Sequence, residues 1–404
     1  MSVHEVKCVK LTEFLPHPDP ETTSLEIVKV WGYEVIVKKG DFKVGDLGLF
    51  VEPDYMVPTS NPLFTFLAKD PTDLKPVRIT TKRLRKVWSQ GLLVKALPHH
   101  KEGDNVMEEL GITRWEPIMK NAPTSGGGSL LGGAPPKKAP TLPVGKIPSY
   151  DLENYKKHSH LLTDGVDEVI ATVKYHGASA RYVVDSDGEF HVGSRTVWKH
   201  KPGTVLRTVT VTETKKPPHP KGFANHYTFL RKMKAFMVYY VQLLIWLLTK
   251  KTTTKDVLAP QCSWWTAAAD NPWIEKWCRE HPNCVVYGEI FGDTIQGKDF
   301  HYGHKNGKVG FRVFDVLTED GKWVNCFDLH HGVDFQPLLK VMRVYEGPMD
   351  RKLLETIAEQ TEDFNPFGEK SGHIREGVVI KRRTEDQTSR VALKLVSNNY
   401  LLKS

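Results

Sequence analysis

The chain has 404 residues, of which 40% are hydrophobic and 26% are charged, so it is long enough for two or three domains with sizeable cores. Its net charge of +8 suggests a polyanionic partner. The five cysteines form no CxxC pair and the N-terminus has no apolar signal segment, which argues against a disulfide-stabilised secreted protein and predicts an intracellular one, whether cytoplasmic, nuclear or organellar.

The first 120 residues are predicted to form a small β-barrel domain. Apolar and polar residues alternate over 25–30 and 34–38, turn residues follow at 39–41, and a further strand is expected over 47–52. Short strands at this spacing are typical of an OB-like barrel.

Basic residues gather in the stretch 77–90, which also carries Trp88. One interpretation is a solvated face. The other is a surface that follows RNA phosphates, with aromatic side chains that stack on bases. The residues selected from this stretch as RNA-binding candidates are Arg78, Arg83 and Arg85.

A Gly- and Pro-rich segment, 121–148, is predicted to be a flexible linker because it has too few apolar residues for a core. The catalytic domain is expected over 149–404. A helical insertion is expected near 203–260, packed beside the nucleotide pocket. Tryptophans between 263 and 278 are expected to pack a helix into the core.

The insertion contains 14 consecutive residues without charge, 235–248, with basic residues on both flanks. A bilayer span needs about 20 residues, so a buried or interfacial helix is predicted and a membrane partner is not expected. RNA or a membrane surface are the two possible partners of the basic flanks.

The candidate chemistry begins with a strand over 169–175 that runs into a turn at Gly177. On a period of two, Lys174 and His176 share one face of this strand. One or two functional groups are found on each of four later predicted strands. These strands are 287–292, 311–316, 375–381 and 392–396. Together they supply two carboxylates, an aromatic plate and a second lysine, which suits a site that binds a nucleoside triphosphate with a metal and attacks its α-phosphate.

These motifs resemble those of the covalent nucleotidyltransferase superfamily of polynucleotide ligases and capping enzymes. Lys174-Tyr175-His176-Gly177 is similar to the nucleotidylated-lysine motif, and Gly193-Ser194-Arg195-Thr196 to the motif that follows it. The patterns at 38–46 and 89–92 are similar to the N-terminal domain of the Deinococcus- and Naegleria-type ATP-dependent RNA ligases. The resemblance implies an α+β protein in which an OB-like barrel is joined to a nucleotidyltransferase domain of ATP-grasp-like antiparallel sheets.

The resemblance also implies roles for individual residues. Lys174 would be the nucleophile, Glu289 and Glu376 would face the metal, and Phe314 would stack on adenine. Arg195 and Gln296 would contact RNA. The catalytic residues implied are Lys174, Glu289, Glu376 and Lys394, and the nucleotide-binding residues implied are Lys174, His176, Gly177, Ser179, Arg195, Glu289, Phe314, Lys381 and Lys394.

The implied reaction uses ATP with Mg²⁺ or Mn²⁺ and joins RNA 3′-OH and 5′-phosphate ends, with nicks in duplexes as the expected substrate. AMP passes from ATP to Lys174, then to the 5′-phosphate, and leaves when the 3′-hydroxyl attacks. Neighbouring lysines, burial and the cation are expected to lower the pKa of Lys174. No obligatory protein partner is indicated.

Two departures from the family pattern stand out. His176 occupies the position of an aspartate in many relatives, and Ala392 stands where many ligases have a lysine. The alternatives are a capping guanylyltransferase or DNA ligase, or a non-catalytic nucleic-acid-binding protein. The first pair resemble one another in carrying an OB domain after the last motif, whereas only ten residues follow Lys394 here.

Overall fold

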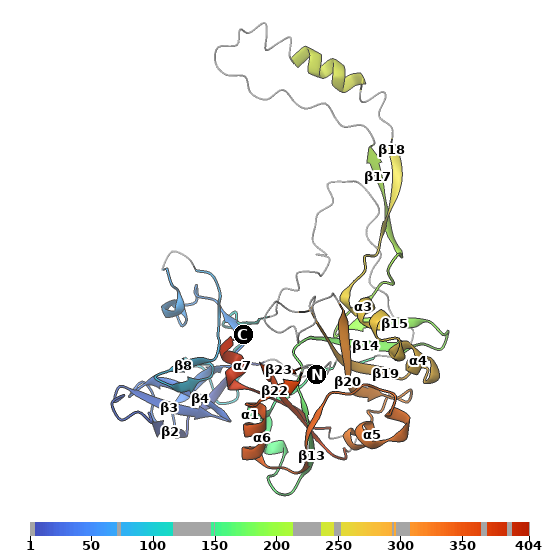
Figure 1. Cartoon of the computed structure of the whole chain (residues 1–404). Coiled ribbons are helices and arrows are strands. Elements are labelled where there is room, and N and C mark those ends of the chain that lie inside the picture. The colour runs from blue at the N-terminus through green and yellow to red at the C-terminus, as the bar shows by residue number, and fades with distance from the viewer. Residues whose placement is uncertain are drawn as a thin grey trace.

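The computed structural model describes residues 5–70, 74–115, 147–148, 150–212, 236–245, 252–292, 295, 308–364, 370–385 and 390–403. An N-terminal all-β domain sits beside a larger domain in which two five-stranded sheets carry helices (Figure 1). The predicted α+β class is therefore confirmed. Most of the predicted linker 121–148 lies outside the described residues, so the domain boundary stays a prediction.

The N-terminal domain is built from short antiparallel strands in several small sheets. The expected strands are present as β3 (Leu25–Val30), β4 (Tyr33–Lys38) and β5 (Leu47–Val51). Their inward residues form two apolar clusters, as the alternation predicts. The remaining strands are β1 (Lys7–Lys10), β2 (Glu13–Pro16), β6 (Tyr55–Val57), β7 (Val77–Arg78), β8 (Lys82–Leu84), β9 (Val87–Ser89), β10 (Leu92–Lys95) and β11 (Thr113–Arg114), with a 3₁₀ turn, η1, at Thr65–Leu67.

The first sheet of the larger domain has the order β12-β25-β24-β13-β21. Its outer face packs on the helices α1 (Tyr155–His158) and α6 (Arg351–Ala358) through an apolar cluster that includes Val169, Val378 and Leu393. Side chains alternate along a strand, so the residues next to Val169, Val378 and Leu393 in the sequence point to the opposite, inner face of the sheet. The strands are β12 (Glu153–Asn154), β13 (Glu168–Val173), β21 (Arg343–Pro348), β24 (Gly377–Arg382) and β25 (Ala392–Val396).

The second sheet has the order β16-β15-β14-β19-β20. Its outer face packs on α3 (Ser263–Asp270) and α4 (Trp273–Glu280), where Trp264 and Trp277 are buried in the core. The tryptophan-rich segment thus packs inward as expected, although as two helices rather than one. The strands are β14 (Ala178–Val184), β15 (Phe190–Ser194), β16 (Trp198–Lys199), β19 (Val285–Gly292) and β20 (Val309–Leu317).

Smaller elements complete the domain. The hairpin β22 (Thr361–Phe364)–β23 (Lys370–Ile374), the helix α5 (Cys326–His331) and the 3₁₀ turns η2 (Ser159–Leu161) and η4 (Val333–Phe335) lie around the sheets. The C-terminal helix α7 (Asn398–Lys403) follows β25 directly. No described helix is long and apolar enough to cross a bilayer.

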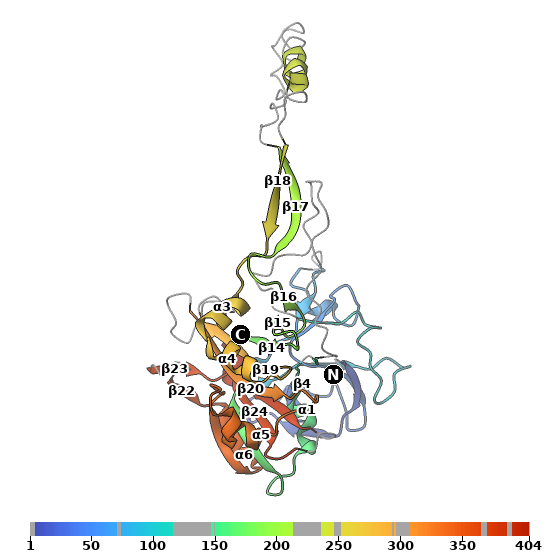
Figure 2. The same cartoon turned by 90° about the vertical axis from the view of Figure 1, so that its right-hand side faces the viewer.

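The insertion differs from the helical subdomain that the sequence predicts. Its base is a two-stranded sheet, β17 (Val205–Thr212) paired with β18 (Thr252–Leu258). The helix 236–245 lies beyond the far end of this hairpin, away from the sheets, in both views (Figures 1 and 2). The expectation that it packs beside the nucleotide pocket is therefore wrong.

The barrel contacts the larger domain through α1. The Gly32 amide donates to the Lys156 carbonyl at 2.8 Å, and the Lys156 ammonium donates to the Gln90 side chain at 2.8 Å. The Lys157 ammonium lies 3.0 Å from the Glu52 carboxylate, and both side chains are largely buried. The Glu52 carboxylate also accepts a hydrogen bond from the Tyr33 hydroxyl at 2.8 Å.

Candidate active site

Lys174 lies at the end of β13, between the facing surfaces of the two sheets. Its amide donates to the Gly377 carbonyl at 2.9 Å, which joins the backbones of the nucleophile segment and β24. Thr172, two residues earlier, is opposite Val379 in the same sheet, and Val379 is opposite Lys394. The register therefore places Lys174 and Lys394 on one face of the first sheet.

Glu289 reaches the same space from the second sheet. It lies on β19 opposite Ser179 of β14, and its neighbour Ile290 belongs to the outer core. Because side chains alternate, Glu289 points inward. The facing sheets thus bring Lys174, Glu289, Glu376 and Lys394 together, as the resemblance implied.

Glu376 holds the Lys174 ammonium directly. The ammonium donates a short hydrogen bond to the Glu376 carboxylate, and both side chains are largely buried. Burial lowers the pKa of Lys174, but Glu376 and Glu289 raise it by more, so its net pKa is above the ordinary value. The expectation of a lowered pKa is therefore wrong for the protein alone, because the nearest charges are carboxylates rather than lysines.

The pKa of Glu289 is also raised, for a different reason. Burial raises its pKa to about 8, with a lowering contribution from Lys174 and a raising one from Glu376. Two carboxylates that share an enclosed space repel one another, and one of them is held protonated. Carboxylate oxygens are the ligands that a divalent cation such as Mg²⁺ prefers.

Two glycines allow the backbone to close around these groups. A Cβ on Gly177 would lie 2.1 Å from the Ile290 carbonyl oxygen and 2.9 Å from the Glu289 side chain. Gly377 has a φ of +150°, and a Cβ there would lie 2.1 Å from the Leu395 carbonyl oxygen. A side chain at either position would push β14 or β24 away from its neighbour.

Lys394 is enclosed on β25. Burial lowers its pKa, and the positive charges of Lys174 and Arg114 lower it further. Arg114 belongs to β11 of the barrel, so the N-terminal domain contributes charge to the site. The charges of Lys174, Lys394 and Arg114 therefore act on one another, and a group of cations of this kind attracts anions.

His176 is oriented by the C-terminal helix. The Tyr400 hydroxyl lies 2.5 Å from Nδ1 of His176, and the Glu376 carboxylate lies 3.9 Å from the same atom. Tyr400 is buried on α7. This helix also reaches the barrel, because Asn398 is bonded to the Gln90 side chain. The imidazole is thereby held against the carboxylate that contacts Lys174.

Lys381 lies elsewhere than the phosphate side that the resemblance implied. Its ammonium donates to the Asp315 carboxylate and to the Phe314 carbonyl, each at 2.7 Å. Arg390 also contacts Asp315, and the pair of cations lowers the pKa of that carboxyl against the effect of burial. A buried lysine with these partners joins the two sheets behind Phe314, and this role fits the contacts better than one in phosphate binding.

Phe314 lies half-buried between two apolar clusters, with its ring 4.6 Å from that of Tyr150. Ser179 is on β14, and its carbonyl accepts a hydrogen bond from the Trp264 indole. Arg195 follows β15, 4.0 Å from the Asp151 carboxylate, and keeps 38% of its side chain exposed. Gln296 lies outside the described residues.

The RNA-binding candidates of the barrel have two different environments. Arg78 is bound to the Asp54 carboxylate and stacks on Trp115 at 3.5 Å, so its guanidinium is engaged within the domain. Arg83 and Arg85 lie on the exposed β8–β9 hairpin and its turn. Arg83 lies 5.6 Å over the Trp88 ring.

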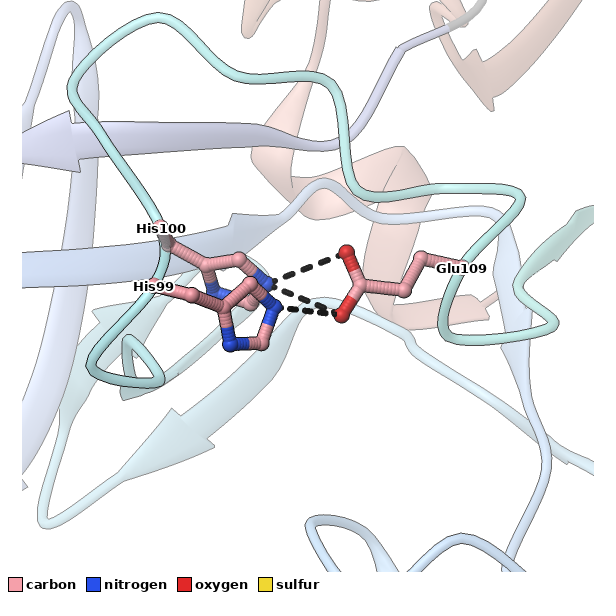
Figure 3. Close-up of side chains that lie close together, drawn as sticks. All are labelled: His99, His100 and Glu109. Carbon is pink, nitrogen blue, oxygen red and sulfur yellow. Dashed lines mark hydrogen bonds and ion pairs between the residues drawn. The ribbon is translucent and has the colours of Figure 1, made fainter.

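A second cluster of residues that could bind a metal lies in the N-terminal barrel domain and not between the two five-stranded sheets. His99 and His100 both face the Glu109 carboxylate, at 2.9 and 3.2 Å from Nε2 (Figure 3). Nδ1 of His100 accepts a hydrogen bond from the Leu97 amide at 3.1 Å. Its Nε2 therefore carries the proton and donates to Glu109 instead of offering a lone pair to a metal.

Sequence reasoning missed Arg114, Asp151 and Tyr400. Arg114 lies in a two-residue strand with no apolar alternation, and Tyr400 lies six residues beyond the last recognisable motif residue, Lys394. Each acquires its place only through packing between segments far apart in the chain. No local signal distinguishes them.

Comparison with protein families supports the two-domain assignment. A family profile described as RNA ligase matches residues 167–396, and a profile described as an OB-fold domain matches residues 5–96. No curated protein matches the sequence.

Solved structures of Naegleria gruberi RNA ligase share the fold. A lysine-to-alanine variant with ATP and Mn has a TM-score of 0.65 at 21% identity and covers 99% of each chain. The enzyme with PPi has a TM-score of 0.63 at 21% identity, again over 99% of each chain. Since the RNA ligase profile spans more than half of the sequence, from β13 to β25, and includes Lys174, Glu289, Glu376 and Lys394, the protein belongs to the RNA ligase family.

Proposed function

We propose that the protein is an ATP-dependent RNA ligase that seals 3′-OH and 5′-phosphate ends, with nicks in RNA duplexes as its substrate, through lysyl-AMP and RNA-adenylate intermediates. The observation that carries this proposal is the contact between the Lys174 ammonium and Glu376, with Glu289 and Lys394 on the surrounding strands. An amine that donates to a carboxylate, with a second lysine on a neighbouring strand, supports this mechanism.

In the first step, the Lys174 amine attacks the α-phosphorus of ATP, a P–N bond forms and the bond to pyrophosphate breaks. The amine must first lose a proton, and the Glu376 carboxylate that already accepts its hydrogen bond is placed to receive it. Lys394 and Arg114 would attract the phosphate oxygens on which charge develops.

In the second step, the RNA 5′-phosphate attacks the lysyl-AMP phosphorus and the P–N bond breaks. In the third, the 3′-hydroxyl attacks the 5′-phosphate and AMP leaves. All three are phosphoryl transfers, which depend on position and charge more than on acid–base groups. Arg195, half-exposed at the rim, would contact the ribose and the RNA end, and Gln296 keeps the RNA role that the resemblance implies.

The metal proposed is Mg²⁺ or Mn²⁺, held by Glu289 and Glu376. The raised pKa of Glu289 supports this assignment, because a cation would relieve the repulsion between the two carboxylates. When bound, the cation supplies positive charge that lowers the pKa of the lysine and neutralises charge on phosphate. The adenine would stack on Phe314.

The N. gruberi RNA ligase variant solved with ATP and Mn has the same fold, and this supports the choice of cofactors. The position of the barrel also supports an RNA ligase over the alternatives, since the OB-fold profile precedes the ligase profile. The pairing of Lys174 with Glu376 favours an active enzyme over a non-catalytic binding protein.

The test is covalent labelling. Purified protein is incubated with Mg²⁺ and α-³²P-ATP or α-³²P-GTP, then analysed on denaturing gels beside Lys174→Ala. The control is Lys340→Ala, which removes a partly buried lysine that donates to the Phe335 carbonyl.

Label from ATP on wild type and Lys340→Ala, but not on Lys174→Ala, is the expected result. Sealing of a nicked RNA duplex then tests the end chemistry. Label from GTP alone would replace this function with capping, and the absence of label on folded protein would exclude the lysyl-nucleotide mechanism.

A further inference from the structure

The most prominent feature that RNA sealing leaves unexplained is the arm formed by β17, β18 and the helix 236–245. The hairpin extends from the second sheet, and the helix lies beyond its tip (Figures 1 and 2). The two strands of the arm pair along their length, from Val205 opposite Leu258 to Thr212 opposite Thr252. The helix is thereby carried well clear of the core of either domain.

The arm helix exposes apolar side chains on more than one face. Met237, Tyr240 and Leu244, three or four residues apart, form one stripe and are 65%, 60% and 59% exposed. Val238 and Ile245, about half exposed, lie on an adjacent stripe. A soluble surface helix has a polar face opposite its apolar one, whereas a helix that is apolar around most of its circumference belongs in an apolar medium.

The sequence of the arm also accounts for the net positive charge of the whole protein. Between Thr214 and Lys255 the sequence has nine lysines and arginines and no aspartate or glutamate, against a net charge of +8 for the entire chain. The remaining residues therefore sum to −1. Long insertions that bind nucleic acid are basic as well, but exposed aliphatic side chains contribute nothing to phosphate contacts or base stacking.

We propose that the arm helix binds the surface of an anionic lipid membrane and lies in the interface, where the positive charge of the surrounding sequence favours anionic headgroups. An apolar segment beside a polybasic sequence supplies the two signals that reversible membrane attachment requires. The helix 236–245 is about 15 Å long, shorter than the ~30 Å hydrocarbon core, so it lies along the surface and does not span.

Two other partners fit the observations less well. A groove on another protein would cover one stripe of the helix and leave Val238 and Ile245 in water. RNA would use the charge and the Tyr240 ring, but it would leave Met237, Val238 and Leu244 in water. The proposal therefore departs from the expectation that a membrane is not a partner of this protein.

The test is co-sedimentation of the full-length protein with vesicles. One set contains 30% phosphatidylserine in phosphatidylcholine, and the other contains phosphatidylcholine alone. The variant Met237→Glu/Tyr240→Glu/Leu244→Glu places charge on the stripe formed by these three residues. The matched control, Val166→Glu/Val333→Glu, places charge at two exposed apolar positions on the body of the molecule.

Wild type and the control should pellet with anionic vesicles and dissociate in high salt, and the helix variant should bind about tenfold more weakly. Equal binding by the helix variant, or no binding by wild type, would overturn the proposal. So would a dimer in sedimentation velocity that the helix variant abolishes, which would assign the stripe to a second copy. RNA binding weakened as much as vesicle binding would assign the helix to RNA. Labelling of Lys174 by ATP should persist in every variant, so this test is independent of the proposed function.

Discussion

At the scale of single residues, the site is a balance of buried charges. Lys174 has its pKa raised because Glu376 and Glu289 surround it, and Glu289 has its pKa raised because it is buried near Glu376. The protein alone therefore holds its nucleophile protonated. The proposed cation and the nucleotide phosphates are the charges that would change this state.

The affinity for Mn²⁺ should depend on pH through Glu289. A raised pKa keeps the carboxyl protonated, and a protonated carboxyl binds a cation poorly, so affinity should rise with pH and level off above about 8. Below that pH, release of one proton predicts about a tenfold gain per pH unit. Free Mn²⁺ measured by electron paramagnetic resonance from pH 6 to 9 gives the affinity.

Glu289→Gln should bind Mn²⁺ weakly with no such rise. Glu109→Gln is the control, because Glu109 is bound to His99 and His100 in the barrel. A wild-type affinity that is flat across this range would contradict a raised pKa at Glu289.

Tyr400 is expected to be a positioning residue for His176. Tyr400→Phe removes the hydroxyl that lies 2.5 Å from Nδ1 and leaves the buried ring in place. The loss of one hydrogen bond is worth about 0.5–1.5 kcal/mol, so self-labelling by ATP should slow about two- to tenfold. The dependence of that rate on pH should also change, because the hydroxyl sets which nitrogen of the imidazole is protonated.

Tyr155→Phe is the matched control for this prediction. It removes another tyrosine hydroxyl, one that accepts a hydrogen bond from Arg351 on the outer face of the first sheet. Rates and pH profiles that are the same for both variants and wild type would show that the contact with His176 has no part in the chemistry.

At the scale of elements, α1 and α7 join the barrel to the site. The Lys157–Glu52 pair is largely buried, and Glu52 is shared with the Tyr33 hydroxyl. Arg114 of β11 lowers the pKa of Lys394, so the position of the barrel affects the charge around the nucleotide. The contact between the two domains therefore influences the charge of the candidate active site.

Lys157→Ala should destabilise the protein by about 3 kcal/mol, because it leaves the Glu52 charge buried without its cation. Lys29→Ala removes a comparable ion pair, with Glu13, whose side chains are 34% and 54% exposed, and should cost less than about 1 kcal/mol. Urea unfolding followed by tryptophan fluorescence compares the two. Equal costs would mean that the Lys157 pair contributes no more than a surface contact.

At the scale of the whole molecule, the arm is separable from the catalytic body. Residues 213–251 lie between Thr212 and Thr252, which are paired in the hairpin, so a short Gly-Asn turn can replace them without moving β17 or β18. The shortened protein should label Lys174 with ATP at a rate within about twofold of wild type, since all of the charged groups around Lys174 remain.

Gel shifts with nicked RNA duplex across a salt series provide the second measurement for this variant. If the arm contacts RNA, the shortened protein will lose affinity and show a shallower salt dependence. Loss of self-labelling by more than tenfold in a folded protein would mean that the arm takes part in the catalytic site.

The sequence by itself determined the two-domain organisation, the strands β3, β4, β5 and β13, and the three charged residues Glu289, Glu376 and Lys394 near Lys174. These depend on local properties, namely side-chain alternation along strands and rare functional groups in apolar runs. Only the tertiary structure decided that Lys381 pairs with Asp315, that Tyr400 contacts His176 and that Arg114 approaches Lys394. Those residues are 66 or more positions apart, and they meet because two sheets face one another and a barrel docks beside them. The arm illustrates the same limit, since an apolar run predicts a helix but not whether the fold buries that helix or holds it in solvent.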